Sequence, residues 1–217
     1  MLTVSLESAP SRSVLAIGCH ADDIEIGCGG TLVHLVQALP AVDVTWVVLG
    51  ARGVRAGEAQ RSAEAFLAGV ADPRIIVRDF RDGFFPHDAV PIKEFFEELK
   101  AQLSPDMIFT HYRGDLHQDH RLACELTWNT WRDHFILEYE IPKYDGDFGT
   151  PNVFFPLSES VVEKKVENLL SHFASQRDRH WFTADLFRAT ARLRGMESNS
   201  ATRYAEAFYG RKVICAA

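Results

Sequence analysis

Short apolar segments alternate with longer amphipathic segments along the first 135 residues of the chain. The apolar segments have the length of strands, and most are rich in β-branched residues, as expected for strands buried on both faces. They cover residues 14–19, 42–49, 74–77 and 107–110. The amphipathic segments predict helices at about residues 30–39, 57–67, 92–103 and 120–131. This alternation predicts an α/β fold, Rossmann-like, with a mostly parallel sheet flanked by helices.

Beyond residue 135 the pattern is looser, and prolines and glycines mark a loop-rich stretch. Further helices are predicted at about residues 158–171, 183–194 and 202–208. The first of these has Ser158 as a suitable N-cap. No linker or internal repeat is visible in the sequence. We therefore expect one domain over residues 1–217, with a core at about 14–135 that an extension at about 136–217 completes.

Composition places the chain among ordinary globular proteins and narrows its partners. It has 217 residues, 47% of them hydrophobic and 24% charged. The formal net charge of -7 argues against nucleic acid as a partner, because a phosphate backbone attracts basic surfaces. Residues 1–13 do not have the basic start and apolar segment of a secretory signal, no apolar run is long enough to cross a membrane, and the four cysteines form no CxxC pair. We expect a cytoplasmic protein with reduced thiols and no stable membrane insertion.

The first cluster of reactive side chains follows the first predicted strand, where His20, Asp22 and Asp23 occur together. In an open α/β sheet the ligand site lies at the carboxyl ends of the strands. His20 and Asp23 can converge on one metal ion, which leaves Asp22 free to act as a base. The alternative is a solvated turn. Gly-Cys-Gly-Gly at 27–30 matches no phosphate-binding motif, so we interpret it as a tight turn from which the next helix starts.

A second cluster follows the fourth predicted strand and contains His117, Asp119 and His120. The two histidines lie on one face if a helix begins near residue 118, and Asp119 could support an imidazole from the outer shell of a metal site. The alternative is a surface turn with incidental histidines. One such cluster after a strand can occur by chance, but two clusters after strands of the same predicted sheet would rarely do so. Their joint occurrence favours a metal site.

The two clusters resemble a known enzyme family. The segment from His20 to Asp23 with the following GCGGTL, and the segment from His117 to His120 with Asp115 ahead of it, resemble the LmbE-like or PIG-L superfamily of zinc-dependent N-acetylglucosaminyl de-N-acetylases. An Arg-Ser-Ala-Glu segment at 61–64 and the segment 204–208 extend the similarity over residues 14–210. Cys19, Ala21 and Gln118 stand where the family usually has proline.

The resemblance implies a mechanism. His20, Asp23 and His120 would be the metal ligands, Asp22 the general base, and a protonated His117 oriented by Asp119 the stabiliser of the oxyanion. Three protein ligands leave positions open for water, which is the catalytic pattern. The implied metal is Zn²⁺, although Fe²⁺ accepts the same donors.

The resemblance also implies a substrate, namely a small N-acetylated amino sugar or its conjugate. Arg61 and Asp82 are candidate substrate-binding residues, while a surface helix arginine and an Asp-Gly turn are the simpler alternatives. Because related proteins are often multimeric, a homo-oligomer is possible. The rival interpretations are a metal-dependent amidohydrolase for a non-sugar amide, and a Rossmann-like module that binds a metal or a nucleotide without catalysis.

Overall fold

The computed structural model describes residues 3, 12–39 and 41–214, and within them the chain forms one seven-stranded sheet with helices on both faces. The strands are β1 (Arg12–Gly18), β2 (Val42–Val48), β3 (Arg74–Val77), β4 (Met107–His111), β5 (Phe135–Tyr139), β6 (Val153–Leu157) and β7 (Tyr204–Gly210). The helices are α1 (Asp23–Ala38), α2 (Val54–Phe66), α3 (Ala89–Gln102), α4 (Gln118–Thr130), α5 (Glu159–His172), the 3-10 helix η1 (Ala174–Gln176) and α6 (Ala184–Glu197).

The strand order is β3-β2-β1-β4-β5-β7-β6. Strands β1 to β5 pair in parallel, whereas β7 runs antiparallel to both β5 and β6. The predicted fold class, α/β with a mostly parallel sheet flanked by helices, is therefore confirmed. Among the described residues no helix is both long and apolar enough to span a membrane. The sheet contains strands from the predicted core and from the predicted extension that follows it. The predicted domain limits include residues that the structure does not describe, so they stay a prediction.

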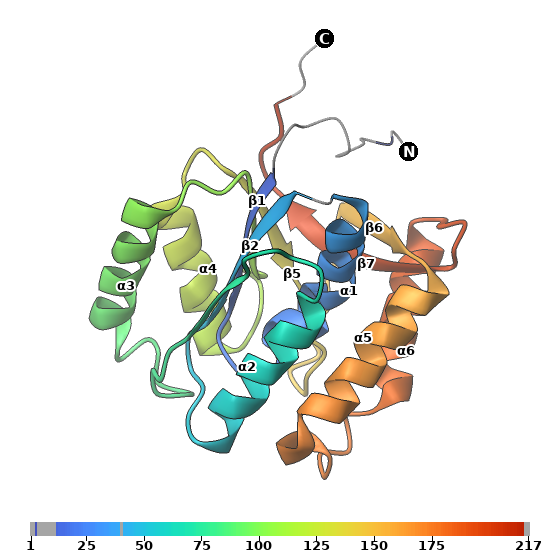
Figure 1. Ribbon diagram of the computed structural model, residues 1–217, viewed down its shortest axis with the longest axis horizontal. Coiled ribbons are helices and arrows are strands. Elements are labelled where there is room, and N and C mark those ends of the chain that lie inside the picture. Colours follow the sequence, from blue (N-terminus) through green and yellow to red (C-terminus); the bar gives the residue numbers. More distant parts are fainter. Residues whose placement is uncertain (1–2, 4–11, 40, 215–217) are drawn as a thin grey trace.

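Two apolar layers sandwich the sheet. Helices α1, α2, α5 and α6 cover one face and α3 and α4 cover the other (Figure 1). Alternate residues of β1 enter different layers, with Val14 and Ala16 in the first and Leu15 and Ile17 in the second. Burial on both faces explains why this strand is a continuous apolar run. It also holds the carboxyl ends of β1 and β4 rigidly beside each other, and the candidate site is built at those ends.

The helix predicted at residues 202–208 is wrong, because this segment is strand β7 and lies between β5 and β6. Alanine and glutamate favour a helix in isolation, but tertiary pairing overrides that preference. Glu206 faces the layer of α1, where its carboxylate accepts hydrogen bonds from the backbone N–H groups of Gly30 (2.9 Å) and Thr31 (2.6 Å) and pairs with Lys165 (2.6 Å). Strands β5 and β6 were not predicted. Strand β6 contains Pro156, which a strand tolerates at the edge of a sheet.

The tight turn predicted at the glycines of residues 27–30 is also wrong, since α1 already begins at Asp23 and includes them. A Cβ atom at Gly27 would lie 2.1 Å from a ring carbon of Tyr139, and one at Gly29 would lie 2.6 Å from the ring of Phe66. These glycines therefore allow aromatic side chains to approach the helix closely. Helix α1 is consequently held against the end of β5, next to the candidate site.

Candidate metal centre and active-site cleft

Loops at the carboxyl ends of the parallel strands bring the two predicted clusters together. The loop from β1 to α1 carries His20 and Asp22, and Asp23 is the first residue of α1. The end of β4 and the start of α4 supply the second cluster. Here His117 is the N-cap of α4, and Asp119 and His120 lie in its first turn. This is the edge of the sheet at which an α/β fold places its ligands.

Three atoms of the predicted ligand set form a compact triangle. Nδ1 of His20 lies 3.2 Å from Oδ2 of Asp23 and 3.2 Å from Nε2 of His120, and the last two atoms are 3.5 Å apart. Ligand bonds of about 2.0–2.1 Å in a tetrahedral zinc site place neighbouring ligand atoms about 3.3–3.4 Å apart. The triangle has the dimensions of one face of such a site. These donors therefore fit a divalent metal ion.

The outer contacts of the two imidazoles fix which nitrogen faces the triangle. Nδ1 of His120 pairs with Oδ2 of Asp115 at 2.9 Å. Nε2 of His20 lies 3.1 Å from Asp82 and 3.3 Å from Asp119. Carboxylates in this position orient metal-binding histidines in many proteins. Burial, together with the neighbouring charge of His111, lowers the pKa of His120 to about 4, so that its imidazole is neutral near pH 7, as metal binding requires.

His111 is a member of the site for which the sequence suggested no role. It ends β4, is fully buried, and places Nε2 3.2 Å from Oδ2 of Asp23. Its ring stacks on that of His120 with centroids 3.8 Å apart, and its Nε2 is 3.2 Å from the hydroxyl of Tyr139. Its position at a strand end, ahead of the two other histidines, was the available signal. His111 packs the two predicted ligands Asp23 and His120 against the end of the sheet.

The charges of the cluster favour a cation. Burial would raise the pKa of Asp23, but the adjacent imidazoles of His120, His20 and His111 outweigh it and hold this pKa well below its usual range. Burial would lower the pKa of His20, yet Asp23 and hydrogen bonds to neighbouring carboxylates raise it well above its usual range. Asp23 therefore stays ionised and stabilises positive charge beside it, as a carboxylate at a metal position does.

Asp22 lies beside the triangle and has a separate partner. It is the N-cap residue of α1, is 5% exposed, and its Oδ1 accepts a hydrogen bond from a guanidinium N–H of Arg55 at 2.7 Å. Burial raises the pKa of Asp22, and the charge of Arg55 opposes that increase. Arg55 is in the first turn of α2, and no motif in the sequence pointed to it. One carboxylate oxygen of Asp22 is thus held in place while the residue faces the cleft.

His117 and Asp119 differ in their contacts from the expected arrangement. Nδ1 of His117 accepts a hydrogen bond from the backbone N–H of Asp119 at 3.3 Å, which leaves Nε2–H as the donor of the neutral ring. Burial and the charge of His20 lower the pKa of His117, which favours this neutral form over the expected protonated one. The carboxylate of Asp119 instead accepts hydrogen bonds from the backbone N–H groups of Gly83 (2.6 Å) and Phe85 (3.1 Å) and contacts His20.

A cleft of about 180 Å³ opens above the triangle. Asp82, whose side chain is 68% exposed, lines it from the loop between β3 and α3. Arg61 is exposed on α2, six residues after Arg55 and so on a different face of that helix, and it does not line the cleft. The walls further include residues that the predicted set lacked, namely Ile141, Pro142, Lys143, Gln176 and Trp181.

Comparison with known proteins places this geometry in a family. The family model described as PIG-L, GlcNAc-PI de-N-acetylase, matches residues 15–131. YaiS of Escherichia coli strain K12, an uncharacterized deacetylase, is 31% identical over 177 residues that cover 77% of this chain and 94% of that protein.

Solved structures share the fold. N,N′-diacetylchitobiose deacetylase from Pyrococcus horikoshii superposes with a TM-score of 0.72 at 22% identity, covering 92% of this chain and 84% of that chain. GalB, the 4-carboxy-2-hydroxymuconate hydratase from Pseudomonas putida KT2440, gives 0.74 at 18% identity, with coverage of 95% and 100%. One fold thus carries both a deacetylase and a hydratase, so the fold alone does not select the reaction. The family match and the relative from Escherichia coli agree with the two motifs, and the chain belongs to the PIG-L family of de-N-acetylases.

Proposed function

We propose that the protein is a zinc-dependent hydrolase that removes the acetyl group from an N-acetylated amino sugar or its conjugate. The observation that carries this proposal is the triangle of His20, Asp23 and His120, with the unligated carboxylate of Asp22 beside it. Three donors that leave coordination positions open, next to a separate base, are the arrangement of a hydrolytic metal site. Membership of a deacetylase family supports the same conclusion.

In this proposal the metal ion would be held by Nδ1 of His20, Oδ2 of Asp23 and Nε2 of His120. When bound, the metal ion would supply a Lewis acid for the acetamide carbonyl and would lower the pKa of a bound water molecule towards about 7. Asp115 and Asp119 hold the two imidazoles through their outer nitrogens. A mixed nitrogen and oxygen donor set is acceptable to Zn²⁺ and to Fe²⁺, and hydrolysis needs no redox change.

Asp22 is the proposed general base. Arg55 holds Oδ1, so the other carboxylate oxygen accepts a proton as a water molecule attacks the carbonyl carbon. The neutral ring of His117 donates from Nε2 to the carbonyl oxygen, on which negative charge develops. When the C–N bond breaks, Asp22 returns its proton to the amine nitrogen. The products are acetate and the free amino sugar, and Asp22 and His117 end the cycle as they began it.

The walls of the cleft suggest how the sugar is held. The side chain of Trp181 offers an apolar ring face and Asp82 offers hydrogen-bond acceptors to hydroxyl groups. Arg61 is proposed as a substrate residue only for a group that extends beyond the cleft, because its side chain is exposed. A raised KM with unchanged kcat in Arg61→Ala would support that role, whereas unchanged KM and kcat would remove Arg61 from the substrate-binding set.

The decisive experiment measures acetate release by metal-analysed protein from a panel of N-acetylhexosamine conjugates, with and without a chelator. N-acetylated amino acids and aryl acetamides are included as non-sugar amides. We expect release from at least one sugar conjugate, loss of activity with the chelator, and recovery on adding Zn²⁺. Release from the non-sugar amides alone would identify a different amidohydrolase. Metal-loaded protein that releases acetate from none of the compounds would overturn the proposal.

A further inference from the structure

The ligand histidine His120 is connected to a cation in a loop that neither motif contains. Lys143 lies in the connection between β5 and β6, with its side chain 12% exposed. Its Nζ forms an ion pair with Oδ2 of Asp115 at 2.9 Å, and the same oxygen pairs with Nδ1 of His120 at 2.9 Å. One carboxylate oxygen is thus shared by the outer nitrogen of a ligand and the ammonium of Lys143.

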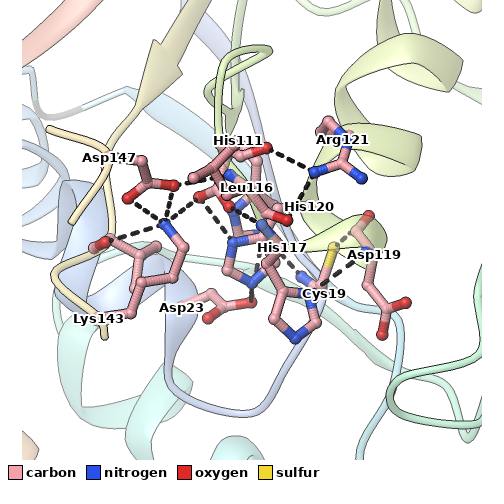
Figure 2. A network of polar contacts seen from close by, with 12 residues as sticks. Cys19, Asp23, His111, Leu116, His117, Asp119, His120, Arg121, Lys143 and Asp147 are labelled. Atoms are coloured by element: carbon pink, nitrogen blue, oxygen red, sulfur yellow. Dashed lines mark hydrogen bonds and ion pairs between the residues drawn. The ribbon is translucent and has the colours of Figure 1, made fainter. Parts of the chain in front are cut away.

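A second carboxylate completes the arrangement. Asp147 accepts from Nζ of Lys143 at 2.6 Å through Oδ1 and at 2.5 Å through Oδ2, and its side chain is 8% exposed. Oδ2 of Asp147 also accepts the backbone N–H of Leu116 at 2.7 Å, one residue before the N-cap of α4. Figure 2 shows the side chains of Lys143 and Asp147 pointing toward one another next to Leu116. The pair therefore contacts both the orienting carboxylate and the backbone of the ligand loop.

The loop that carries this pair is itself fixed. Glu140, just after β5, accepts hydrogen bonds from the backbone N–H of Gly149 (2.9 Å), from Arg194 (2.6 Å) and from the hydroxyl of Tyr209 (2.6 Å). These contacts close the base of the loop against α6 and β7. Lys143 is consequently presented to Asp115 from a braced position, unlike a mobile surface lysine.

We propose that Lys143 and Asp147 are positioning residues that hold Asp115 against His120 and thereby set the affinity of the site for its metal ion. The proposal rests on the proposed function only for the existence of the metal site. Without Lys143, the buried carboxylate of Asp115 and the partly buried carboxylate of Asp147 are neighbours with no cation between them, and their repulsion turns Asp115 away from His120. Loss of an outer-shell partner of a metal-binding histidine typically weakens metal binding about 10–100-fold.

The test measures the dissociation constant of Zn²⁺ by competition with a chromogenic chelator, and the visible absorption of the Co²⁺-substituted protein. Lys143→Met is expected to weaken Zn²⁺ binding about tenfold and to change the Co²⁺ bands, because the outer shell acts on ligand geometry. Lys143→Arg retains the charge and its donors and is expected to restore most of the affinity. Lys93→Met is the matched control, since Lys93 pairs with Glu97 on α3 away from the cleft and its loss leaves both readouts unchanged.

Thermal unfolding of each variant is recorded alongside. If Lys143→Met does not fold, Asp147→Asn decides, because it removes the charge that holds the ammonium while keeping an acceptor for Leu116, and it is expected to weaken Zn²⁺ binding as well. The inference is overturned if a folded Lys143→Met binds Zn²⁺ as tightly as the unaltered protein does. Asp147→Asn decides in the same way if Lys143→Met does not fold. The inference is also overturned if the unaltered protein binds no metal. Acetate release is scored separately. A weaker-binding Lys143→Met together with an inactive, metal-loaded unaltered protein would reject the deacetylase function and retain the inference.

Discussion

Replacing Asp22 with asparagine tests the proposed role of Asp22 as general base separately from metal binding. Asparagine keeps an oxygen for Arg55 but cannot accept the proton of the attacking water. Asp22 is not a corner of the triangle that His20, Asp23 and His120 form, so Asp22→Asn is expected to bind metal as the unaltered protein does. A positioned general base contributes about 10²–10⁴ in rate. At 1.36 kcal/mol per factor of ten, the barrier rises by about 2.7–5.4 kcal/mol.

The effect of this substitution on stability is far smaller. The ion pair between Asp22 and Arg55 at 2.7 Å becomes a neutral hydrogen bond, and the arginine side chain is 31% exposed, so solvent screens the lost charge. The expected cost is about 1 kcal/mol. For a chain of this length that lowers Tm by about 2–4 °C, which cannot reduce the folded fraction at 25 °C noticeably.

The assay measures kcat for acetate release at matched metal content, with the zinc dissociation constant determined on the same preparation. The expected outcome is a rate reduced at least a hundredfold with an affinity within about twofold of the unaltered protein. Turnover by Asp22→Asn within tenfold of the unaltered protein would refute the assignment of the base. Loss of metal together with activity would show instead that Asp22 belongs to the ligand set.

Two further substitutions test the site and one tests the core. His120→Ala should lose both bound metal and activity, and a variant that keeps stoichiometric metal would remove this ligand from the set. Arg55→Ala should lower kcat about tenfold with unchanged metal content, because one catalytic group is misplaced, and Arg55→Lys should restore part of the lost kcat. Equal kcat in the unaltered protein, Arg55→Ala and Arg55→Lys would contradict the role of Arg55 in placing Asp22. Leu15→Ala, at a fully buried position of β1, should cost about 2–5 kcal/mol in the free energy of unfolding by denaturant, and a cost below about 1 kcal/mol would show that the layer under α3 and α4 repacks.

Strands β1, β2 and β4 were predictable because they are buried over most of their length and therefore appear as largely apolar runs. Strand β7 was not, because its alternating alanines and Glu206 have no strand signature on their own. Their strand conformation depends on neighbours about 70 residues earlier in β5 and on α1 about 175 residues earlier. Pairing over such separations leaves no local periodicity for a sequence pattern to reveal.

The candidate site likewise contains some residues that the sequence could predict and others that it could not. His20, Asp23, His117 and His120 sit in dense motifs directly after strands, so their convergence could be expected from the topology. Other members lie singly in unrelated segments and become neighbours only after folding; they are Arg55 in α2, Tyr139 in β5, and Lys143 and Asp147 in the loop that follows it. The predicted contact of Asp119 with His117 differs from the structure, because the carboxylate of Asp119 accepts hydrogen bonds from backbone N–H groups of the β3–α3 loop. The sequence does not predict the path of that loop.

The insertion of β7 between β5 and β6 has a consequence for how the chain can fold during synthesis. Strand β6 pairs only with β7 within the described residues, and β7 is made about 50 residues after it. At about 5–20 residues per second, this leaves the edge of β6 unpaired for roughly 3–10 s. During the same interval the N–H groups of Gly30 and Thr31 in α1 lack the carboxylate of Glu206. The site-bearing helix therefore reaches its final packing among the last events, and a chain interrupted before residue 204 would expose an aggregation-prone strand edge.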